Sequence, residues 1–277
     1  MTSRSDWQDA VGRSWASSYA RTDRSFSGLT GHLLGRIAAF DGGDVLDVGC
    51  GAGELSLAIA RARARARVIG VDVSADLIAA ARDRADERSN VRFELGDAAN
   101  WSEPGFAPDL IVSRHGVMFF NDPPDAFAHL HSMASGEARL VFSCFRSPRE
   151  NLWASGIAEL LGLPPGDPEA PGPFAFADPQ RVEAILGAGG WSQIDFEPVD
   201  FAWIAGMGPD PVEDAIEFFS RIGPAAPALR ALEGDARVAT ETIVRSWLEA
   251  HRSGDLVAFA AAAWIVTASA DRRHRLR

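Results

Sequence analysis

A run of thirteen residues, 44–56, reads Asp-Val-Leu-Asp-Val-Gly-Cys-Gly-Ala-Gly-Glu-Leu-Ser and constrains the fold more than any other stretch. Its first part is a short aliphatic run, which is typical of a strand buried on both faces of a parallel sheet. Gly49, Gly51 and Gly53 follow at once, and glycine lets the backbone turn sharply and approach a ligand closely. A helical period begins at Leu55, so the free N–H groups of that helix face the same place. The run therefore predicts a strand, a ligand-binding turn and a helix.

The spacing of these glycines differs from the dinucleotide fingerprint G-x-G-x-x-G/A. Counted from Gly49 the sixth position is Glu54, and counted from Gly51 it is Ser56. Asp47 would repel a pyrophosphate, whereas it suits the ammonium group of an amino-acid ligand. The loop resembles motif I of the class I S-adenosylmethionine-dependent methyltransferases, whose usual form reads V-L-D-[VL]-G-C-G-[TA]-G. The alternative, a glycine-rich turn without a ligand, would cost backbone entropy with no return.

Further segments resemble one bacterial group of this family. They are residues 113–123, which read S-R-H-G-V-M-F-F-N-D-P, residues 172–179, which read G-P-F-A-F-A-D-P, and residues 262–268. The group usually reads S-R-F-G-V-M-F-F, so His115 replaces a phenylalanine. The resemblance covers nearly the whole chain and implies S-adenosylmethionine as cofactor and methyl transfer to a small-molecule acceptor. It does not name the acceptor, because most members of the group have no assigned substrate.

The order of apolar runs predicts an α/β fold. Strands are expected near 45–48, 68–72, 91–98 (a strand and its turn), 108–115 and 138–145, with helices between them and a helical segment up to about residue 41. Beyond these, we expect a helix near 179–186, a strand near 191–199 and a last strand over 256–267. The resemblance implies a Rossmann-like, mostly parallel sheet of seven strands with helices on both faces and an antiparallel last strand between its neighbours. We expect one domain over 1–277, with a cofactor-binding core at about 41–146.

Two segments interrupt this regular series, at about 148–178 and 209–253, and we expect them to form helical caps or lids that determine the acceptor. The first is rich in proline and glycine, and the second is amphipathic and helical. An apolar acceptor pocket is expected there, and core packing is an equally open role for each candidate. The candidates are Phe174, Phe176, Phe218, Phe219 and Trp247.

Small and acidic residues at the strand ends form the expected cofactor site. Asp72 follows the glycine loop by about 20 residues, the position of a carboxylate that binds ribose hydroxyls. Val73 and Leu77 are expected to flank adenine, and Gly96-Asp97-Ala98 resembles the family's adenine-reading motif. Ser113 ends the fourth strand and is expected to face the reacting methyl group. The full set is Asp47, Gly49, Cys50, Gly51, Gly53, Asp72, Val73, Leu77, Asp97, Ala98 and Ser113.

Four ring-bearing residues have two open roles each. Trp7, Trp15 and Tyr19 either pack in the core or fold over the sulfonium cation, which aromatic faces attract. His115 lies at the same strand end as Ser113 and is the candidate catalytic base, because an unperturbed imidazole titrates near ~6.5. The alternative for His115 is packing as a neutral, hydrogen-bonded side chain.

Composition restricts the function further. The chain has no lysine, which excludes a Schiff base to pyridoxal phosphate and a P-loop lysine. A net charge of −11 and a pI near 5.0 argue against nucleic acid as a partner. Cys50 and Cys144 give neither a disulfide framework nor metal-ligand spacing. The first residues lack an apolar signal core, and the stretch from Leu256 to Ala270 is too short to span a membrane, so we expect a cytoplasmic protein.

Two rival functions remain at this level. One is a non-catalytic module that binds S-adenosylmethionine or S-adenosylhomocysteine, which motif I alone does not exclude. The other is a nicotinamide-dependent dehydrogenase, which the G-x-G-x-G spacing and the absence of a Tyr-x-x-x-Lys pair disfavour. The sequence leaves the oligomeric state open.

Overall fold

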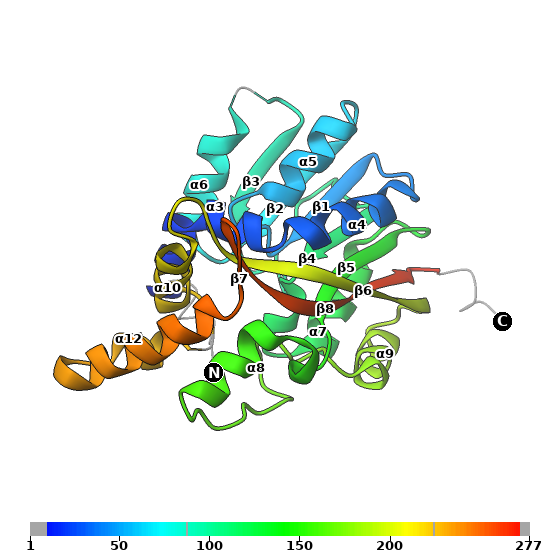
Figure 1. Ribbon diagram of the computed structural model, residues 1–277. Helices are drawn as coiled ribbons and strands as arrows, with labels where there is room; N and C mark the ends of the chain where they lie inside the picture. The colour runs from blue at the N-terminus through cyan, green and yellow to red at the C-terminus, as the bar shows by residue number, and fades with distance from the viewer. Residues whose placement is uncertain (1–9, 87, 224, 272–277) are drawn as a thin grey trace.

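The computed structural model describes residues 10–86, 88–223 and 225–271, and its strands form one sheet (Figure 1). The strand order is β3-β2-β1-β4-β5-β8-β6, and a two-residue strand, β7, pairs with β8. β1 to β5 are parallel, whereas β8 runs antiparallel between β5 and β6. The expected mostly parallel sheet with an antiparallel last strand is confirmed, and β7 is the one strand more than the seven expected. The strands are β1 (Asp44–Val48), β2 (Arg67–Asp72), β3 (Val91–Leu95), β4 (Leu110–Arg114), β5 (Arg139–Phe145), β6 (Ser192–Met207), β7 (Arg252–Ser253) and β8 (Leu256–Ser269).

Helices surround this sheet, and several begin where a side chain caps the first turn. The Ser74 hydroxyl accepts a hydrogen bond from the backbone N–H of Leu77, as expected for a cap, and Asp122 caps the next crossover helix in the same way. The α-helices are α2 (Ala10–Ser17), α3 (Tyr19–Ser25), α4 (Ser27–Ala38), α5 (Glu54–Ala62), α6 (Ala75–Ala85), α7 (Pro123–Met133), α8 (Leu152–Leu160), α9 (Pro179–Ala188), α10 (Pro211–Arg221), α11 (Ala226–Arg230) and α12 (Gly234–Glu249). Short 3₁₀ turns are η1 (Val117–Phe119) and η2 (Pro148–Glu150).

The central strand β1 determines where a ligand can enter. Val45 and Leu46 are fully buried, because both faces of β1 are covered. β2 lies on one side of β1 and β4 on the other, so the chain reverses its direction of travel across the sheet at this strand. Ligands in open α/β sheets bind at such a reversal, outside the carboxyl ends of the strands. The glycine loop follows β1 at this edge.

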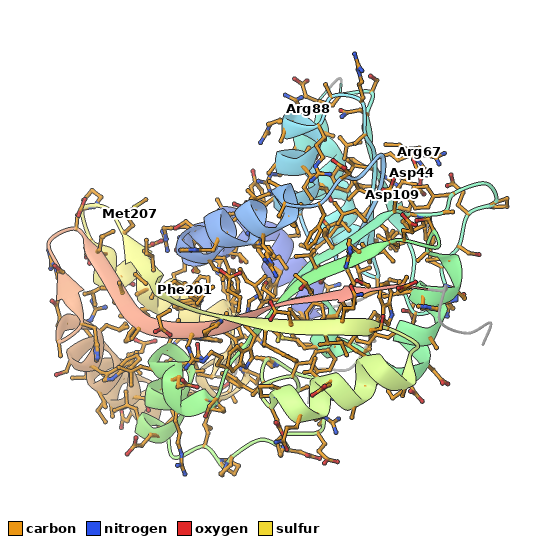
Figure 2. All side chains as sticks on the ribbon, turned by 90° about the vertical axis from the view of Figure 1, so that its right-hand side faces the viewer. Asp44, Arg67, Arg88, Asp109, Phe201 and Met207 are labelled. Carbon is orange, nitrogen blue, oxygen red and sulfur yellow. The ribbon has the colours of Figure 1, made fainter. Side chains whose placement is uncertain are left out.

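The opposite edge of the sheet is closed by polar contacts between strand starts (Figure 2). Asp44 opens β1 and forms an ion pair of 2.7 Å with Arg67, which opens β2. The Asp109 carboxylate, just before β4, accepts hydrogen bonds from the backbone N–H groups of Gly43 and Asp44 at 3.0 and 3.1 Å. These contacts align the three strand starts, so their carboxyl ends also meet at one level.

The C-terminal half departs from the expected boundaries. β6 continues to Met207 rather than ending near 199, because it pairs with β8 along its whole length, and Pro198 is tolerated in an edge strand. Within the described chain, residues 148–178 contain one α-helix, α8, in their first part. The apolar stretch from Leu256 is the buried strand β8, as expected. In the described ranges, no helix has both the length and the apolar character that a membrane crossing requires.

Candidate active site

A cavity of about 350 Å³ lies at the carboxyl ends of β1, β2 and β4, within the size range of small-molecule sites. Its wall combines the loops after these strands with residues from α3 and from the C-terminal half. Trp15 and Tyr19 belong to this wall, so of the two roles left open for them, the structure favours covering the site, whereas Trp7 lies outside the described residues. The wall includes residues 47–52, 71–73, 96–99, 114–116 and 118–122, together with Thr22, Asp23, Phe26, Leu77, Phe145, Trp153, Trp203 and Phe218.

The glycine loop has the tight geometry that its sequence predicts. Gly49, Gly51 and Gly53 all have positive φ, at 65°, 54° and 84°. A Cβ on Gly49 would lie 2.9 Å from the Gly116 Cα, and a Cβ on Gly53 would meet the Phe93 ring at 2.7 Å, so both positions require glycine. A Cβ on Gly51 would meet nothing within 4 Å, and Gly51 lines the cavity. Close backbone approach to a ligand is therefore possible at Gly51.

Asp47 offers a buried carboxylate to the cavity. The residue is 1% exposed, and its Oδ2 accepts a hydrogen bond of 2.5 Å from the Ser56 hydroxyl. Its Oδ1 is buried and has no hydrogen-bond partner among the described residues. Burial raises the pKa of Asp47 to about 7, because the charged form is poorly solvated. A ligand ammonium would satisfy Oδ1 and offset this cost, so the site fits an amino-acid ligand.

Asp72 connects the second strand to the glycine loop. Its Oδ2 accepts a hydrogen bond from the Gly51 N–H and its Oδ1 accepts one from the Ser74 N–H, both at 2.9 Å. Burial raises the pKa of this carboxyl, and hydrogen bonds from the backbone N–H groups of Ser74, Gly51 and Val73 oppose that effect. A carboxylate has about four acceptor sites, so one remains for a ligand hydroxyl. Val73, Leu77, Asp97 and Ala98 line the same cavity, which brings together the expected ribose and adenine contacts.

Two residues that were expected to contact the cofactor, Ser113 and Gly53, lie outside the cavity wall. Ser113 is fully buried; its hydroxyl donates to the Val48 carbonyl at 2.7 Å and accepts from the Gly116 N–H at 3.1 Å. Ser113 thus holds β4 against β1, and its hydroxyl is buried away from the cavity wall. Gly53 caps α5 beneath the loop. The sequence does not predict these two positions, because each depends on a neighbour that only the folded chain brings close.

Arg114 carries the cationic charge in the wall; the strand end 113–115 was expected to face the reacting methyl group, but the sequence assigns Arg114 no role there. Its guanidinium is paired with Glu54 at the start of α5 and with Asp23 in α3, at 3.1 Å for the latter. Asp23 also pairs with Arg84 at 2.7 Å. Burial lowers the pKa of Arg114, and Asp23 opposes that effect. This network joins three helices and a strand end around the cavity.

His115 lines the cavity beside Arg114 but differs from the expected base. It is 7% exposed, and its Nδ1 lies 2.9 Å from the Ser143 Oγ. Burial, with a smaller contribution from the Arg114 charge, lowers the pKa of His115 well below 6.5, so the ring is neutral at neutral pH. Its Nε2 is buried without a hydrogen-bond partner among the described residues. The backbone has φ of 58°, an uncommon conformation for a residue other than glycine.

The acceptor-pocket candidates are mostly core residues. Of the five, only Phe218 lines the cavity, whereas Phe176 and Phe219 are fully buried in the core and Trp247 stacks on Phe259 at 4.7 Å. Phe174 is half-buried and packs against Phe145 and Trp153 outside the wall. Phe145, Trp153 and Trp203 line the cavity in their place. Sequence pattern alone does not separate lining from packing among apolar rings. Within the described residues, no cluster of metal-ligating side chains exists.

Comparison with known proteins places this site in a family. Residues 45–135, which hold the glycine loop and the strand ends just described, match the model of a methyltransferase domain. This match supports a class I S-adenosylmethionine-dependent methyltransferase domain over residues 45–135. The cofactor of the family is S-adenosylmethionine, as the glycine loop indicates.

Individual methyltransferases resemble different portions of the chain. A trans-aconitate 2-methyltransferase of Variovorax paradoxus is 32% identical over 117 residues, which are 42% of this chain and 41% of that protein. A malonyl-[acyl-carrier protein] O-methyltransferase of Magnetococcus marinus is 24% identical over 76% of this chain and 71% of its own. A Haemonchus contortus phosphoethanolamine N-methyltransferase 2, solved in complex with S-adenosyl-L-methionine, aligns with a TM-score of 0.55 at 15% identity, over 95% of this chain and 59% of that one. The chain thus matches less than half of the first relative's length.

Proposed function

We propose that this protein transfers a methyl group from S-adenosylmethionine to a small-molecule acceptor. The observation that carries the proposal is the unpartnered Oδ1 of Asp47, a buried carboxylate at the edge of the glycine loop. A buried acceptor without a partner costs free energy, and a ligand ammonium group would remove that cost. A pyrophosphate would add to it, which is why the nicotinamide-dependent dehydrogenase is disfavoured.

The cofactor assignment follows the same cavity wall outward from Asp47. We assign the amino-acid part to Asp47 and to the loop of Gly49, Cys50 and Gly51, the ribose hydroxyls to Asp72, and the adenine to Val73, Leu77, Asp97 and Ala98. All of these residues line the cavity. Trp15 and Tyr19 lie over the site from the N-terminal helices, where an aromatic face attracts a sulfonium.

The bound cofactor supplies a methyl group on a sulfonium leaving group, so transfer is an in-line displacement at carbon. The chain needs no nucleophile of its own for this step. Its contribution is to align the acceptor and to exclude water, and alignment is worth up to ~7 to 11 kcal/mol. The neutral ring of His115 would form a hydrogen bond with the acceptor and would not act as a general base.

We further propose one domain over 1–277, with a cofactor-binding core at about 41–146 and acceptor-determining caps at about 148–178 and 209–253. Trp153 and Pro173 of the first cap and Phe218 and Ile222 of the second line the cavity, which supports this division. Exchanging both segments for those of a relative should change acceptor preference and leave cofactor affinity unaltered. The two cysteines are buried and free, which fits a cytoplasmic location, and the acidic net charge argues against a nucleic-acid partner.

Calorimetric titration of S-adenosylmethionine tests the binding half of the proposal, with Asp47→Asn and Asp72→Asn as variants and Asp195→Asn as a surface control. We expect both site variants to bind at least tenfold more weakly than the control. An Asp72→Asn protein that binds as tightly as wild type would remove Asp72 from the ribose site. Incubation with methyl-labelled cofactor and a metabolite extract tests the catalytic half. A non-catalytic cofactor-binding module, the rival function, would bind the cofactor and leave no labelled product.

A further inference from the structure

The charges on the cavity wall exclude one class of acceptor. Arg114 is the fully ionised cation among the described lining residues. Glu54 and Asp23 already pair with its guanidinium. The Thr30 hydroxyl also lies 3.1 Å from its Nη1. Burial lowers the pKa of His115, so its ring adds no positive charge at neutral pH. The remaining ionisable wall residues are acidic. The wall therefore offers an anionic acceptor no uncommitted cationic side chain, and an unpaired buried anion is unfavourable. The acidic residues are Asp23, Asp47, Asp72, Asp97, Asp122 and Asp125.

A row of rings forms the wall on the side of β4, β5 and β6. The His115 and Phe145 centroids are 4.1 Å apart, and those of Phe145 and Trp153 are 5.1 Å apart. Trp153 and Trp203 stack with centroids 4.6 Å apart and planes inclined by 17°, and Phe218 contacts Trp203 edge-on at 5.1 Å. All five residues line the cavity and are at least nine-tenths buried. Such a wall accommodates a flat, apolar molecule by stacking and burial of apolar surface.

Two members of this row, His115 at one end and Trp203 next to the other end, each carry a buried polar atom without a hydrogen-bond partner in the described chain. One is the His115 Nε2 and the other is the Trp203 Nε1. Other indole N–H groups are satisfied: that of Trp153 donates to the Asn151 side chain at 3.3 Å, and that of Trp264 to the Ala177 carbonyl at 3.2 Å. An unsatisfied buried N–H is costly and calls for an explanation. A bound molecule with a polar group at each end would satisfy both atoms.

We infer that the methyl acceptor is an uncharged, flat, largely apolar molecule that carries a hydroxyl group placed at the His115 Nε2 and a carbonyl-type oxygen that accepts a hydrogen bond from the Trp203 Nε1. Within the proposed methyltransferase function on which it rests, this inference names the acceptor class. The hydroxyl at His115 is the methylated group, because His115 directly precedes Gly116, and a Cβ on Gly49 of the glycine loop would lie 2.9 Å from the Gly116 Cα. In the transfer, a bond would form between the hydroxyl oxygen and the methyl carbon while the carbon–sulfur bond of S-adenosylmethionine breaks. S-adenosylhomocysteine would leave, and the hydroxyl proton would be released to solvent.

Matched naphthalene probes test the charge of the acceptor. Each is titrated by calorimetry at pH 7 into protein saturated with S-adenosylhomocysteine. The probes are 6-acetyl-2-naphthol, which is neutral, 6-hydroxy-2-naphthoate, which is anionic, and 6-(aminomethyl)-2-naphthol, which is cationic. We expect the neutral probe to bind at least tenfold more tightly than either charged one. Any smaller ratio, including no binding by the neutral probe, overturns the inference.

Two variants test the polar ends. Trp203→Phe should weaken 6-acetyl-2-naphthol about tenfold and 2-naphthol, which lacks the carbonyl, hardly at all, because one hydrogen bond is removed. His115→Phe should weaken 6-acetyl-2-naphthol about tenfold and 2-acetylnaphthalene, which lacks the hydroxyl, hardly at all. Trp264→Phe, which removes a satisfied indole outside the cavity, is the matched control. Equal weakening of both probes by a variant would show a packing role and overturn that assignment.

The affinity for S-adenosylmethionine is measured on the same preparations. If wild-type protein binds the cofactor and methylates other acceptors but fails the probe ratios, the acceptor class is wrong and the proposed function stands. If wild-type protein does not bind S-adenosylmethionine, the proposed function itself fails. Transfer of a labelled methyl group to the 6-acetyl-2-naphthol oxygen would support both.

Discussion

Asp23 in α3 and Arg114 at the end of β4 form an ion pair of 3.1 Å, although they lie far apart in the chain. The two side chains are 18% and 13% exposed, so the pair is largely removed from water. Asp23 also pairs with Arg84 of α6. The N-terminal helices that carry Trp15 and Tyr19 are therefore held over the cavity by charge as well as by packing.

Removal of this carboxylate should loosen the cover over the cofactor. We expect Asp23→Ala to lower the free energy of unfolding by roughly 1–3 kcal/mol, because it removes a partner from two partly buried guanidinium groups, those of Arg114 and Arg84. The affinity for S-adenosylmethionine should fall in the same variant, as measured by calorimetry beside thermal unfolding. Asp195→Ala removes a surface partner of Arg36 and should change stability by less than ~0.5 kcal/mol. Equal effects of the two substitutions would contradict a role for the buried pair.

Cofactor affinity should depend on the ionisation of Asp47. Its pKa of about 7 in the free protein means that the carboxyl is mostly protonated at pH 6 and mostly ionised at pH 8. An ammonium ligand favours the ionised form, so affinity should rise about tenfold from pH 6 to pH 8, with release of a proton on binding. Titrations in buffers of different ionisation enthalpy measure both quantities. Asp47→Asn should bind weakly at both pH values, and a persistent pH dependence in that variant would assign the titration elsewhere.

The same raised pKa has an opposite effect on the stability of the free protein. The folded chain binds the Asp47 proton more tightly than the unfolded chain, so the contribution of Asp47 to stability is lost as pH rises from about 4 to about 7. Asp47→Asn should therefore be more stable than wild type at pH 8, by roughly 1–3 kcal/mol, and similar to it at pH 4. Urea unfolding at the two pH values checks the sign. A variant less stable at pH 8 would show that the carboxylate is already satisfied.

The rate should not report a titration of His115 near neutral pH. Since the pKa of His115 lies well below 6.5, its neutral form persists from pH 6.5 upward. With an identified acceptor, kcat/KM of His115→Phe should be about tenfold lower than that of wild type at every pH between 6.5 and 8.5. His115→Asn tolerates the positive φ and offers a polar group, so it should recover part of the loss. A rising limb near pH 6.5 that only His115→Phe removes would instead assign His115 as a general base.

Alanine substitution of two glycines should have opposite effects on stability, because one glycine lies in the strained glycine loop and the other in an ordinary helix. Gly49→Ala places a methyl group 2.9 Å from the Gly116 Cα at a positive φ, so we expect lost cofactor binding and a lower melting temperature. Gly31→Ala in α4 meets nothing within 4 Å and should raise stability by roughly 0.5–1 kcal/mol. Both effects are read from thermal unfolding and calorimetry. A tolerated Gly49→Ala would mean that the loop adapts.

Local pattern accounts for the parts of the fold that the sequence predicted well. The buried strand before Gly49, the turn and the helix start lie within thirteen residues, and Asp72 follows a second strand of the same kind. The Ser74 cap was predictable for the same reason, because a cap depends on residues within one turn.

Non-local partners explain what the sequence missed. Nothing near Arg114 indicates that Asp23 and Glu54 will pair with it, and nothing near Ser113 indicates that the Val48 carbonyl will take its hydroxyl. The same reason applies to the aromatic candidates for the acceptor pocket. Phe174, Phe176, Phe219 and Trp247 are apolar rings like those that line the cavity, so the residue type alone does not tell the two roles apart. Phe145, Trp153 and Trp203 differ from them only in where the sheet and caps place their rings.

The position of β8 has a consequence for how the chain folds. β6 has no sheet partner other than β8, and β8 is made from residues 256–269, after β6 and three helices in the chain. A nascent chain that ends before Leu256 therefore leaves β5 and the long β6 with open edges, which invite pairing with other chains. Closure of the sheet must await these late, long-range contacts, which slow folding. The cavity wall on that side, including Trp203 in β6, can form only after this step.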